Sequence, residues 1–249
     1  MVAAAAAVGI ERFAFAEHVF HFTDAIETNA YLRECAERWS EGPGTTIQEY
    51  FAAARASGER LPEVAVAVGV EFDFVPENPA LAEHARDLTK AHPWDVVLGS
   101  VHALTGDRSI FRHTNEISPA EAWSDYHARL LASVESGLFD VITHPLRLIA
   151  SKLESPADLP DRLDELAEAA ANSGVAIEVN GSDLRLAQPL VEQLIAAIAR
   201  RNAPLSLGSD AHRPRTVGSV LPALDLLRAA GIREALSFKR RVATAEPIV

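Results

Sequence analysis

Short apolar segments alternate along the chain with longer stretches in which apolar residues recur at helical spacing. The short segments are rich in Val, Ile, Leu and Phe and predict β-strands, most of them buried on both faces as in a parallel sheet. They cover residues 12–17, 64–72, 95–101, 139–143, 175–179 and 204–207. The longer stretches predict helices over residues 25–39, 47–57, 80–92, 119–136, 159–172, 189–201 and 221–230.

Capping residues mark several of the predicted helix ends. Ser118 precedes one helix with Glu121 three residues later, and Gly174 follows another. The alternation of strands and helices predicts an α/β fold with right-handed crossovers. No linker rich in Gly, Pro or Ser interrupts this pattern, and no internal repeat is found, so residues 1–249 are expected to form a single domain.

Polar side chains able to bind metals stand where the predicted strands end. In chain order they are Glu17, His18, Glu71, His102, His144, Asn180, Asp210 and His212. In a parallel barrel the carboxyl ends of the strands converge on one face, which is where such enzymes keep their active sites. A histidine after a strand is, taken alone, more often a loop or capping residue. Its recurrence at successive strand ends favours a shared metal site.

The types of side chain in this set indicate the chemistry. Glu71 lies inside an apolar strand, where an unpaired carboxylate is costly and requires a cation or a proton. Imidazole and carboxylate ligands without thiolates suit Zn²⁺, Mn²⁺ or Fe²⁺. Because the candidate ligands number more than four, two or more ions are expected. Clustered divalent ions are suited to phosphoryl transfer.

The remaining reactive side chains lack such a setting. Five histidines lie in predicted helices or polar loops, where solvated or capping roles are expected: His21, His84, His92, His113 and His127. Cys35 lies on an amphipathic helix without a histidine in register, so no nucleophilic role is expected. The chain contains no P-loop, dinucleotide-binding glycine pattern, GxSxG or HExxH motif.

Charge and cysteine content narrow the classes of partner. With 23 Lys and Arg against 35 Asp and Glu, the net charge is −12, which gives no electrostatic support for binding nucleic acid or a membrane surface. An anionic substrate therefore requires a local cationic site. The single cysteine excludes an intramolecular disulfide and fits a reducing compartment, so a cytoplasmic location is expected. No apolar run reaches the roughly 18–20 residues of a membrane span.

Six ordered segments resemble motifs of the polymerase and histidinol phosphatase (PHP) superfamily. They are GIERFAFAEH (9–18), VEFDFVP (70–76), VLGSVH (97–102), SGLFDVITHP (136–145), EVNGSDLR (178–185) and LGSDAH (207–212). Residues 238–248 are similar to the closing strand of that family. The VLGSVH segment looks like the signature of the histidinol-phosphatase branch. The resemblance extends over nearly the whole chain.

This resemblance implies a fold and a metal centre. The fold is a distorted (β/α)7 barrel of the TIM type, with the active site at the carboxyl face of the strands. The centre holds two or three divalent ions (zinc, manganese or iron), and the implied ligands are His18, Glu71, His102, His144, Asp210 and His212. Glu71 bridges two of these ions. Glu71, Asp210 and His212 are the implied catalytic residues.

The chain departs from the family pattern in two places. The first family motif, a His-x-His on the first strand, is absent, and that strand is expected before the helix that begins at Met1. A wrongly assigned start or a shortened chain is the preferred explanation, and a degenerate, inactive protein is the alternative. Where the family often has Asp-Leu, this chain has Leu146-Arg147. Arg185 is implied to bind the substrate phosphate through paired, charge-assisted hydrogen bonds, and Arg147 to approach it.

The expected function is metal-dependent hydrolysis of a phosphomonoester, with L-histidinol phosphate of histidine biosynthesis as the first candidate. One alternative is another PHP phosphoesterase that acts on nucleotides or sugar phosphates. Another is an inactive barrel with a binding role. The expected partner is a small phosphorylated substrate, without nucleic acid or membrane, and the sequence does not define the oligomeric state.

Overall fold

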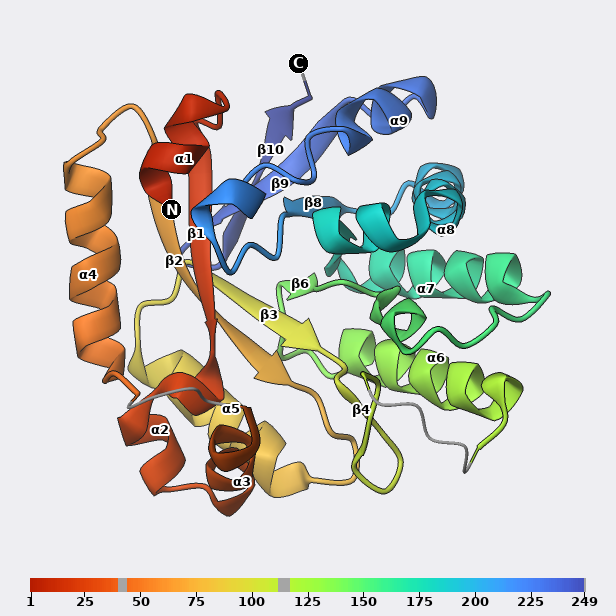
Figure 1. Cartoon of the computed structure of the whole chain (residues 1–249), viewed down its shortest axis with the longest axis horizontal. Helices are drawn as coiled ribbons and strands as arrows, with labels where there is room; N and C mark the ends of the chain where they lie inside the picture. Colours follow the sequence, from red (N-terminus) through yellow and green to blue (C-terminus); the bar gives the residue numbers. More distant parts are fainter. Residues whose placement is uncertain (40–43, 112–116, 249) are drawn as a thin grey trace.

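A curled sheet of six parallel strands forms the centre of the protein in the computed structural model, which describes residues 1–39, 44–111 and 117–248 (Figure 1). The spatial order is β1-β2-β3-β6-β7-β8, and every neighbouring pair is parallel. The strands are β1 (Arg12–His18), β2 (Ala65–Asp73), β3 (Val96–Ser100), β6 (Val141–Ile142), β7 (Ala176–Asn180) and β8 (Leu205–Gly208). All six were expected from the apolar runs.

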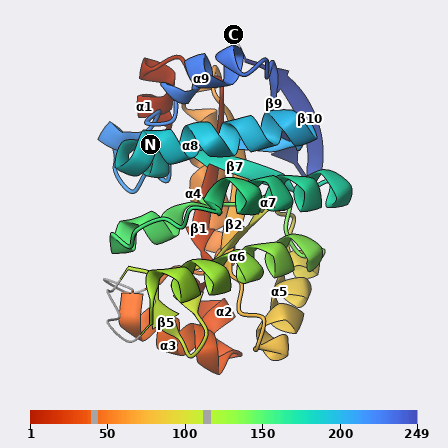
Figure 2. The ribbon, with the colours of Figure 1, turned by 90° about the vertical axis from the view of Figure 1, so that its right-hand side faces the viewer.

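Helices connect the strands and cover the outer side of the curl (Figures 1 and 2). Figure 2 shows α6, α7 and α8 side by side over one part of the sheet. The α-helices are α1 (Val2–Ala7), α2 (Thr23–Glu27), α3 (Ala30–Trp39), α4 (Ile47–Glu59), α5 (Pro79–Ala91), α6 (Pro119–Glu135), α7 (Leu159–Ser173), α8 (Gly181–Arg201) and α9 (Ala223–Ala229). Short 3-10 helices are η1 (Val19–His21), η2 (Arg147–Ser151) and η3 (Pro214–Thr216). No helix among the described residues has the length and apolarity needed to cross a bilayer.

Most helix boundaries follow the capping signals. Ser118 and Glu121 form both hydrogen bonds of a capping box, and Gly174 ends α7 with a left-handed φ of 73°. Two predicted helices differ from the structure. The stretch 25–39 divides into α2 and α3, and α8 begins at Gly181, eight residues before the predicted start. A non-helical Ala187 interrupts α8 just before Pro189, because proline disfavours helical geometry in the residues that precede it.

The two ends of the sheet differ from its middle. β1 is an end strand, and its residues alternate between half-buried (Phe13, Phe15) and exposed (Ala14, Ala16), whereas all five residues of β7 are buried. The sheet has six strands rather than the seven of the expected barrel within the ranges that the structure describes, and it is curled as a half-barrel.

The expected closing strand is instead an antiparallel hairpin outside this sheet, formed by β9 (Glu234–Lys239) and β10 (Val242–Pro247). A second small antiparallel pair, β4 (Ala103–Leu104) and β5 (Arg108–Ser109), follows β3. The turn of the β9–β10 hairpin lies at the amino ends of the central strands. There the Arg241 amide donates to the Asp95 carbonyl, and the Arg241 guanidinium binds the Asp140 carboxylate. The carboxyl ends of the strands, at the opposite side, carry the candidate site.

Candidate metal centre

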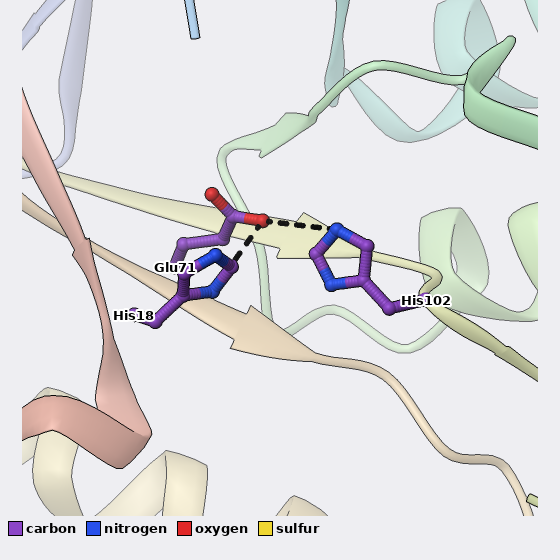
Figure 3. Close-up of side chains that lie close together, drawn as sticks. All are labelled: His18, Glu71 and His102. Carbon is purple, nitrogen blue, oxygen red and sulfur yellow. Dashed lines mark ion pairs between the residues drawn. The ribbon is translucent and has the colours of Figure 1, made fainter. Parts of the chain in front are cut away.

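Glu71 lies at the middle of the candidate site, near the carboxyl end of β2. The strand register places it directly beside His18, the last residue of β1. His102 follows β3 on the other side of Glu71, two residues after that strand ends. Figure 3 shows the side chains of His18, Glu71 and His102 pointing toward one another from these three neighbouring strand ends. The sequence-based expectation that these residues meet is confirmed.

A single oxygen of Glu71 faces three imidazole rings. Glu71 Oε1 lies 3.8 Å from His18 Nδ1, 3.8 Å from His102 Nε2 and 3.3 Å from His144 Nε2. The Glu71 side chain is 8% exposed. Burial by itself raises the pKa of this carboxyl group, but the facing rings of His18, His144 and His102 outweigh burial and hold the pKa well below its usual value. A buried anion thus lies within a ring of nitrogen atoms.

This arrangement fits a divalent cation. The ligand atoms of His18, Glu71 and His102 lie within 4.8 Å of one another. Separations of 3.8 Å are too long for hydrogen bonds, yet two ligands bound to one ion at about 2.1 Å lie up to about 4.2 Å apart. Nδ1 of His18 and Nδ1 of His144 are buried without a hydrogen-bond partner among the described residues. Imidazole with carboxylate is a donor set for zinc, manganese or iron.

Asp73 orients the His102 ring, a role that the sequence reasoning missed. Nδ1 of His102 lies 2.5 Å from Asp73 Oδ1, and the Ser100 hydroxyl donates to the same oxygen over 3.1 Å. Burial opposes charge on both partners, but their contact lowers the pKa of Asp73 and raises that of His102. A carboxylate behind an imidazole fixes the ring so that its other nitrogen faces the metal. The signal was present, because Asp73 follows Glu71 by two residues and therefore shares its face of β2.

Glu178 supports His144 from below, a second role that the sequence reasoning missed. Oε2 of Glu178 accepts hydrogen bonds from the His144 amide (2.8 Å), the Asn180 side-chain amide (2.8 Å) and the Thr143 hydroxyl. These contacts hold His144 at a left-handed φ of 34°, a backbone strain that is typical of functional sites. Burial raises the pKa of Glu178. Gly208 on β8 leaves the room that this carboxylate occupies, because a Cβ there would lie 1.7 Å from Glu178 Oε1.

The β8 side of the site is organised differently. Asp210 follows β8 at a left-handed φ of 48°, and its Oδ2 accepts a hydrogen bond of 2.7 Å from Nη1 of Arg147. Burial raises the pKa of Asp210, but the Arg147 guanidinium outweighs it and the pKa is lowered. Asp210 and His212 are not part of the compact group around Glu71 that the described residues form. The histidine–glutamate half of the site and the Asp210 half are therefore distinct.

The other expected site residues lie at the surface. The His212 side chain is 73% exposed, and its Nδ1 lies 3.7 Å from Asp210 Oδ1. Arg185 is exposed near the start of α8, where its Nη2 donates to the Ser182 hydroxyl over 2.9 Å. The roles expected for these two residues stay predictions. Cys35 is buried, and burial raises the pKa of its thiol to about 12, which argues against a thiolate nucleophile.

Two of the histidines expected to be solvated or capping have definite surroundings. His127 Nε2 lies 2.9 Å from Glu165 Oε2, on the helices. His21 Nδ1 lies 2.7 Å from Glu17 Oε1, and the ring of His21 packs against that of His18, with 6.0 Å between centroids. His113 lies outside the described residues.

A match to a protein family decides the relationship of the chain. The PHP domain profile matches residues 1–182, which include His18, Glu71, His102 and His144. The chain belongs to the PHP domain family. The resemblance inferred from the motifs is thus confirmed, and the cluster around Glu71 fits the metal dependence of PHP proteins.

Individual relatives agree with this assignment. A Deinococcus radiodurans protein named "Probable histidinol-phosphatase" is 28% identical over 205 residues, covering 73% of this chain and 72% of its own. A Syntrophotalea carbinolica protein named "Probable phosphatase" is 34% identical over 142 residues, 55% of this chain, and the match spans about half (51%) of that relative.

A crystal structure from Listeria monocytogenes, provisionally named a histidinol phosphatase, superposes with a TM-score of 0.67. The superposition covers 88% of this PHP chain and 90% of that one, at 15% sequence identity. At this level of identity the likeness concerns the fold.

Proposed function

We propose that this PHP protein is a metal-dependent phosphomonoester hydrolase, with L-histidinol phosphate as its preferred substrate. The observation that carries the proposal is the buried Glu71 carboxylate surrounded by three imidazole rings at the strand ends. The names of the Deinococcus and Syntrophotalea relatives support phosphate chemistry, and the former also supports the substrate. The VLGSVH segment that carries His102 adds support for the same branch.

His18, Glu71, His102 and His144 would hold the cation. A bound divalent ion supplies positive charge that neutralises phosphate oxygens and makes water a better nucleophile. The protein supplies the orientation: Asp73 fixes the His102 ring, and Glu178 fixes the backbone of His144. Because these supports are buried, the ligands keep their positions without the entropy cost of ordering flexible side chains.

The substrate side of the proposal rests on exposed residues next to this centre. Arg185 is the phosphate-binding candidate, since a guanidinium forms paired hydrogen bonds with phosphate oxygens and its contact with Ser182 is at the surface. His212 is the candidate for proton exchange with the substrate, because its ring is exposed and unburied by any neighbour. Positive charge here offsets the repulsion of an anion by a chain of net charge −12.

The test is phosphate release by protein that has been stripped of metal and then reloaded with Zn²⁺, Mn²⁺ or Fe²⁺. The panel contains L-histidinol phosphate, a nucleoside monophosphate, a sugar phosphate and, as a control, a phosphodiester. We expect hydrolysis only after reloading, with the highest kcat/KM for L-histidinol phosphate. A preference for a nucleotide or sugar phosphate would indicate a different PHP phosphoesterase. Metal binding without release from any ester would indicate an inactive barrel that binds its ligand.

A further inference from the structure

The guanidinium of Arg147 is buried among acceptors from three different elements. Nε donates to Asp183 Oδ1 over 2.9 Å, Nη1 donates to Asp210 Oδ2 over 2.7 Å, and Nη2 donates to Asn180 Oδ1 over 3.1 Å. Asn180 ends β7, Asp183 lies in the first turn of α8, and Asp210 follows β8. All three nitrogen atoms of the guanidinium are therefore engaged at the carboxyl ends of the strands.

Burial makes these contacts obligatory rather than incidental. The side chain of Arg147 is 9% exposed, that of Asp183 is 2% exposed and that of Asp210 is 19% exposed. Removing one partner from a buried ion pair leaves an uncompensated charge and costs about 3–5 kcal/mol. Asp210 would have to break its contact with Arg147 in order to turn its Oδ2 to a metal ion. His212 faces the same, already paired carboxylate.

The two halves of the site thus receive positive charge in different ways. Around Glu71 the facing atoms are imidazole nitrogens, two of them without hydrogen-bond partners among the described residues. Around Asp210 the facing atom is a permanently charged guanidinium nitrogen, which stays protonated in proteins. The first half has a place for an added cation, and the second already contains one.

We infer that Arg147 is the fixed cation of the Asp210 half, standing where the family resemblance implies a second metal ion, so that the chain binds one divalent ion at Glu71. The inference rests on the proposed metal-dependent function. Arg147 then acts as a positioning residue for Asp210, since its nitrogens already serve protein acceptors. The charge it supplies there does not depend on the concentration of metal.

The experiment counts metal ions per chain after dialysis against Zn²⁺ or Mn²⁺, by ICP-MS and by calorimetric titration, for the parent and two variants. We expect one ion in the parent and one in Asp210→Asn, with affinities within about threefold of each other. Glu71→Gln should retain less than a tenth of an ion. Asp210→Asn keeps the size of the side chain and leaves Arg147 bonded to Asp183 and Asn180, so it is expected to fold.

Arg147→Met extends the test, because it frees the Asp210 carboxylate. We expect this variant, if circular dichroism shows it folded, to bind a second ion. If it does not fold, the comparison of the parent with Asp210→Asn still decides. Two or more ions in the parent, with one lost in Asp210→Asn, would overturn the inference, as would a parent that binds none.

Failure of the proposed function gives a different result. A parent that binds one ion, and keeps it in Asp210→Asn, but releases phosphate from no ester contradicts the proposed hydrolase while leaving the role of Arg147 intact. Conversely, an active parent with two ions and an Asp210→Asn variant with one contradicts only the role of Arg147.

Discussion

Charged groups gather at both ends of the central sheet, and they are arranged differently. At the amino ends, every atom has a partner. Asp140, just before β6, accepts a hydrogen bond from the Val97 amide (2.8 Å) and is bound by both Nε and Nη2 of Arg241. Asp95, just before β3, accepts from the Val68 and Arg240 amides. These carboxylates staple neighbouring strands to one another and to the β9–β10 hairpin.

At the carboxyl ends, the side chains around Glu71 are less completely paired. His18 and His144 each bury a nitrogen without a partner among the described residues, and the facing distances of 3.8 Å are too long for hydrogen bonds. An unpaired buried polar atom costs about 1–3 kcal/mol. Such a cost is tolerated where an added ligand removes it.

The difference separates residues that fold the protein from residues that serve its chemistry. Carboxylates of similar burial occur at both ends, so burial and charge alone do not distinguish the two roles. What distinguishes them is whether the chain itself satisfies each polar atom. Variants at the amino ends should therefore change stability without changing metal binding, and variants around Glu71 should do the reverse.

Glu71→Gln should have the largest effect. The change removes the anion that faces three imidazoles, and we expect affinity for Zn²⁺ or Mn²⁺ to fall by more than about 100-fold, because even loss of an outer-shell partner costs 10–100-fold. Phosphate release should fall with it. Glu165→Gln is the matched control, since Glu165 also faces a histidine, His127, but on the outer helices. Metal content of Glu71→Gln equal to that of the parent would disprove the role of Glu71.

Asp140→Ala should break the amino end instead. It leaves the buried Val97 amide without its acceptor and Arg241 without its bidentate partner. Because the Arg241 side chain is 33% exposed and regains water, we expect a loss of about 2 kcal/mol in the free energy of unfolding, mainly from the amide. Urea denaturation measures the loss, and Asp225→Ala, at an exposed pair with Arg228, should change little. A fall in metal affinity in folded Asp140→Ala would contradict the separation of roles.

Asp73→Asn tests an outer partner of the centre. The asparagine keeps the shape but no longer offers a charged acceptor to Nδ1 of His102. We expect metal affinity to fall by about 10–100-fold. Calorimetric titration of the folded variant measures the change. An unchanged affinity would show that the orientation of His102 depends on other contacts.

The sequence predicts the frame of this molecule better than its details. The six strands are recognisable because parallel strands are continuous apolar runs, and the metal-binding side chains of His18, His102 and His144 are recognisable because each follows such a run. The break between α2 and α3 at Thr28 and Asn29 is less visible, because no proline or glycine marks it. Tertiary packing decides such a break.

The pairing of Arg147 was not predictable from the sequence. It depends on how η2 lies against α8 and the loop after β8, whose residues are far apart along the chain. The sequence reasoning expected Arg147 to approach a phosphate, since it weighs residue types and local position but not three-body placement. Asp73 and Glu178, by contrast, lie in the recognised segments and on the strands that carry the site, so their involvement could have been found from strand alternation.

Arg185→Ala should have a smaller effect, confined to the substrate. Because its printed contact is one surface hydrogen bond to Ser182, metal content and unfolding free energy should stay at parent values. We expect KM for the preferred phosphomonoester to rise about tenfold, the loss of one charge-assisted contact. Arg200→Ala, at the opposite end of the same helix, is the control. Unchanged KM and kcat in Arg185→Ala would assign Arg185 to the ordinary surface.

The smallest expected effect is the pH dependence of the Asp73–His102 pair in metal-free protein. The folded-state pKa of Asp73 is lowered from 3.8, so its contribution to stability is present above pH 3.8 and is lost as the pH falls through the folded value. The folded-state pKa of His102 is raised from 6.5, so its contribution is present below pH 6.5 and is lost as the pH rises through the folded value. Both contributions are complete only between these limits.

The difference in unfolding free energy between the parent and Asp73→Asn should therefore be greatest between about pH 4 and 6.5 and should decline on both sides, with a change of order 1 kcal/mol. Urea denaturation in EDTA at pH 5.5 and pH 9 measures the alkaline decline. At the amino end, the pair of Asp140 with Arg241 contains no histidine, so the difference between the parent and Asp140→Ala should be the same at both pH values. A flat profile for Asp73→Asn would show that His102 does not gain a proton from its contact with Asp73. A centre built on that ring would then meet no proton in competition with the metal over this range of pH.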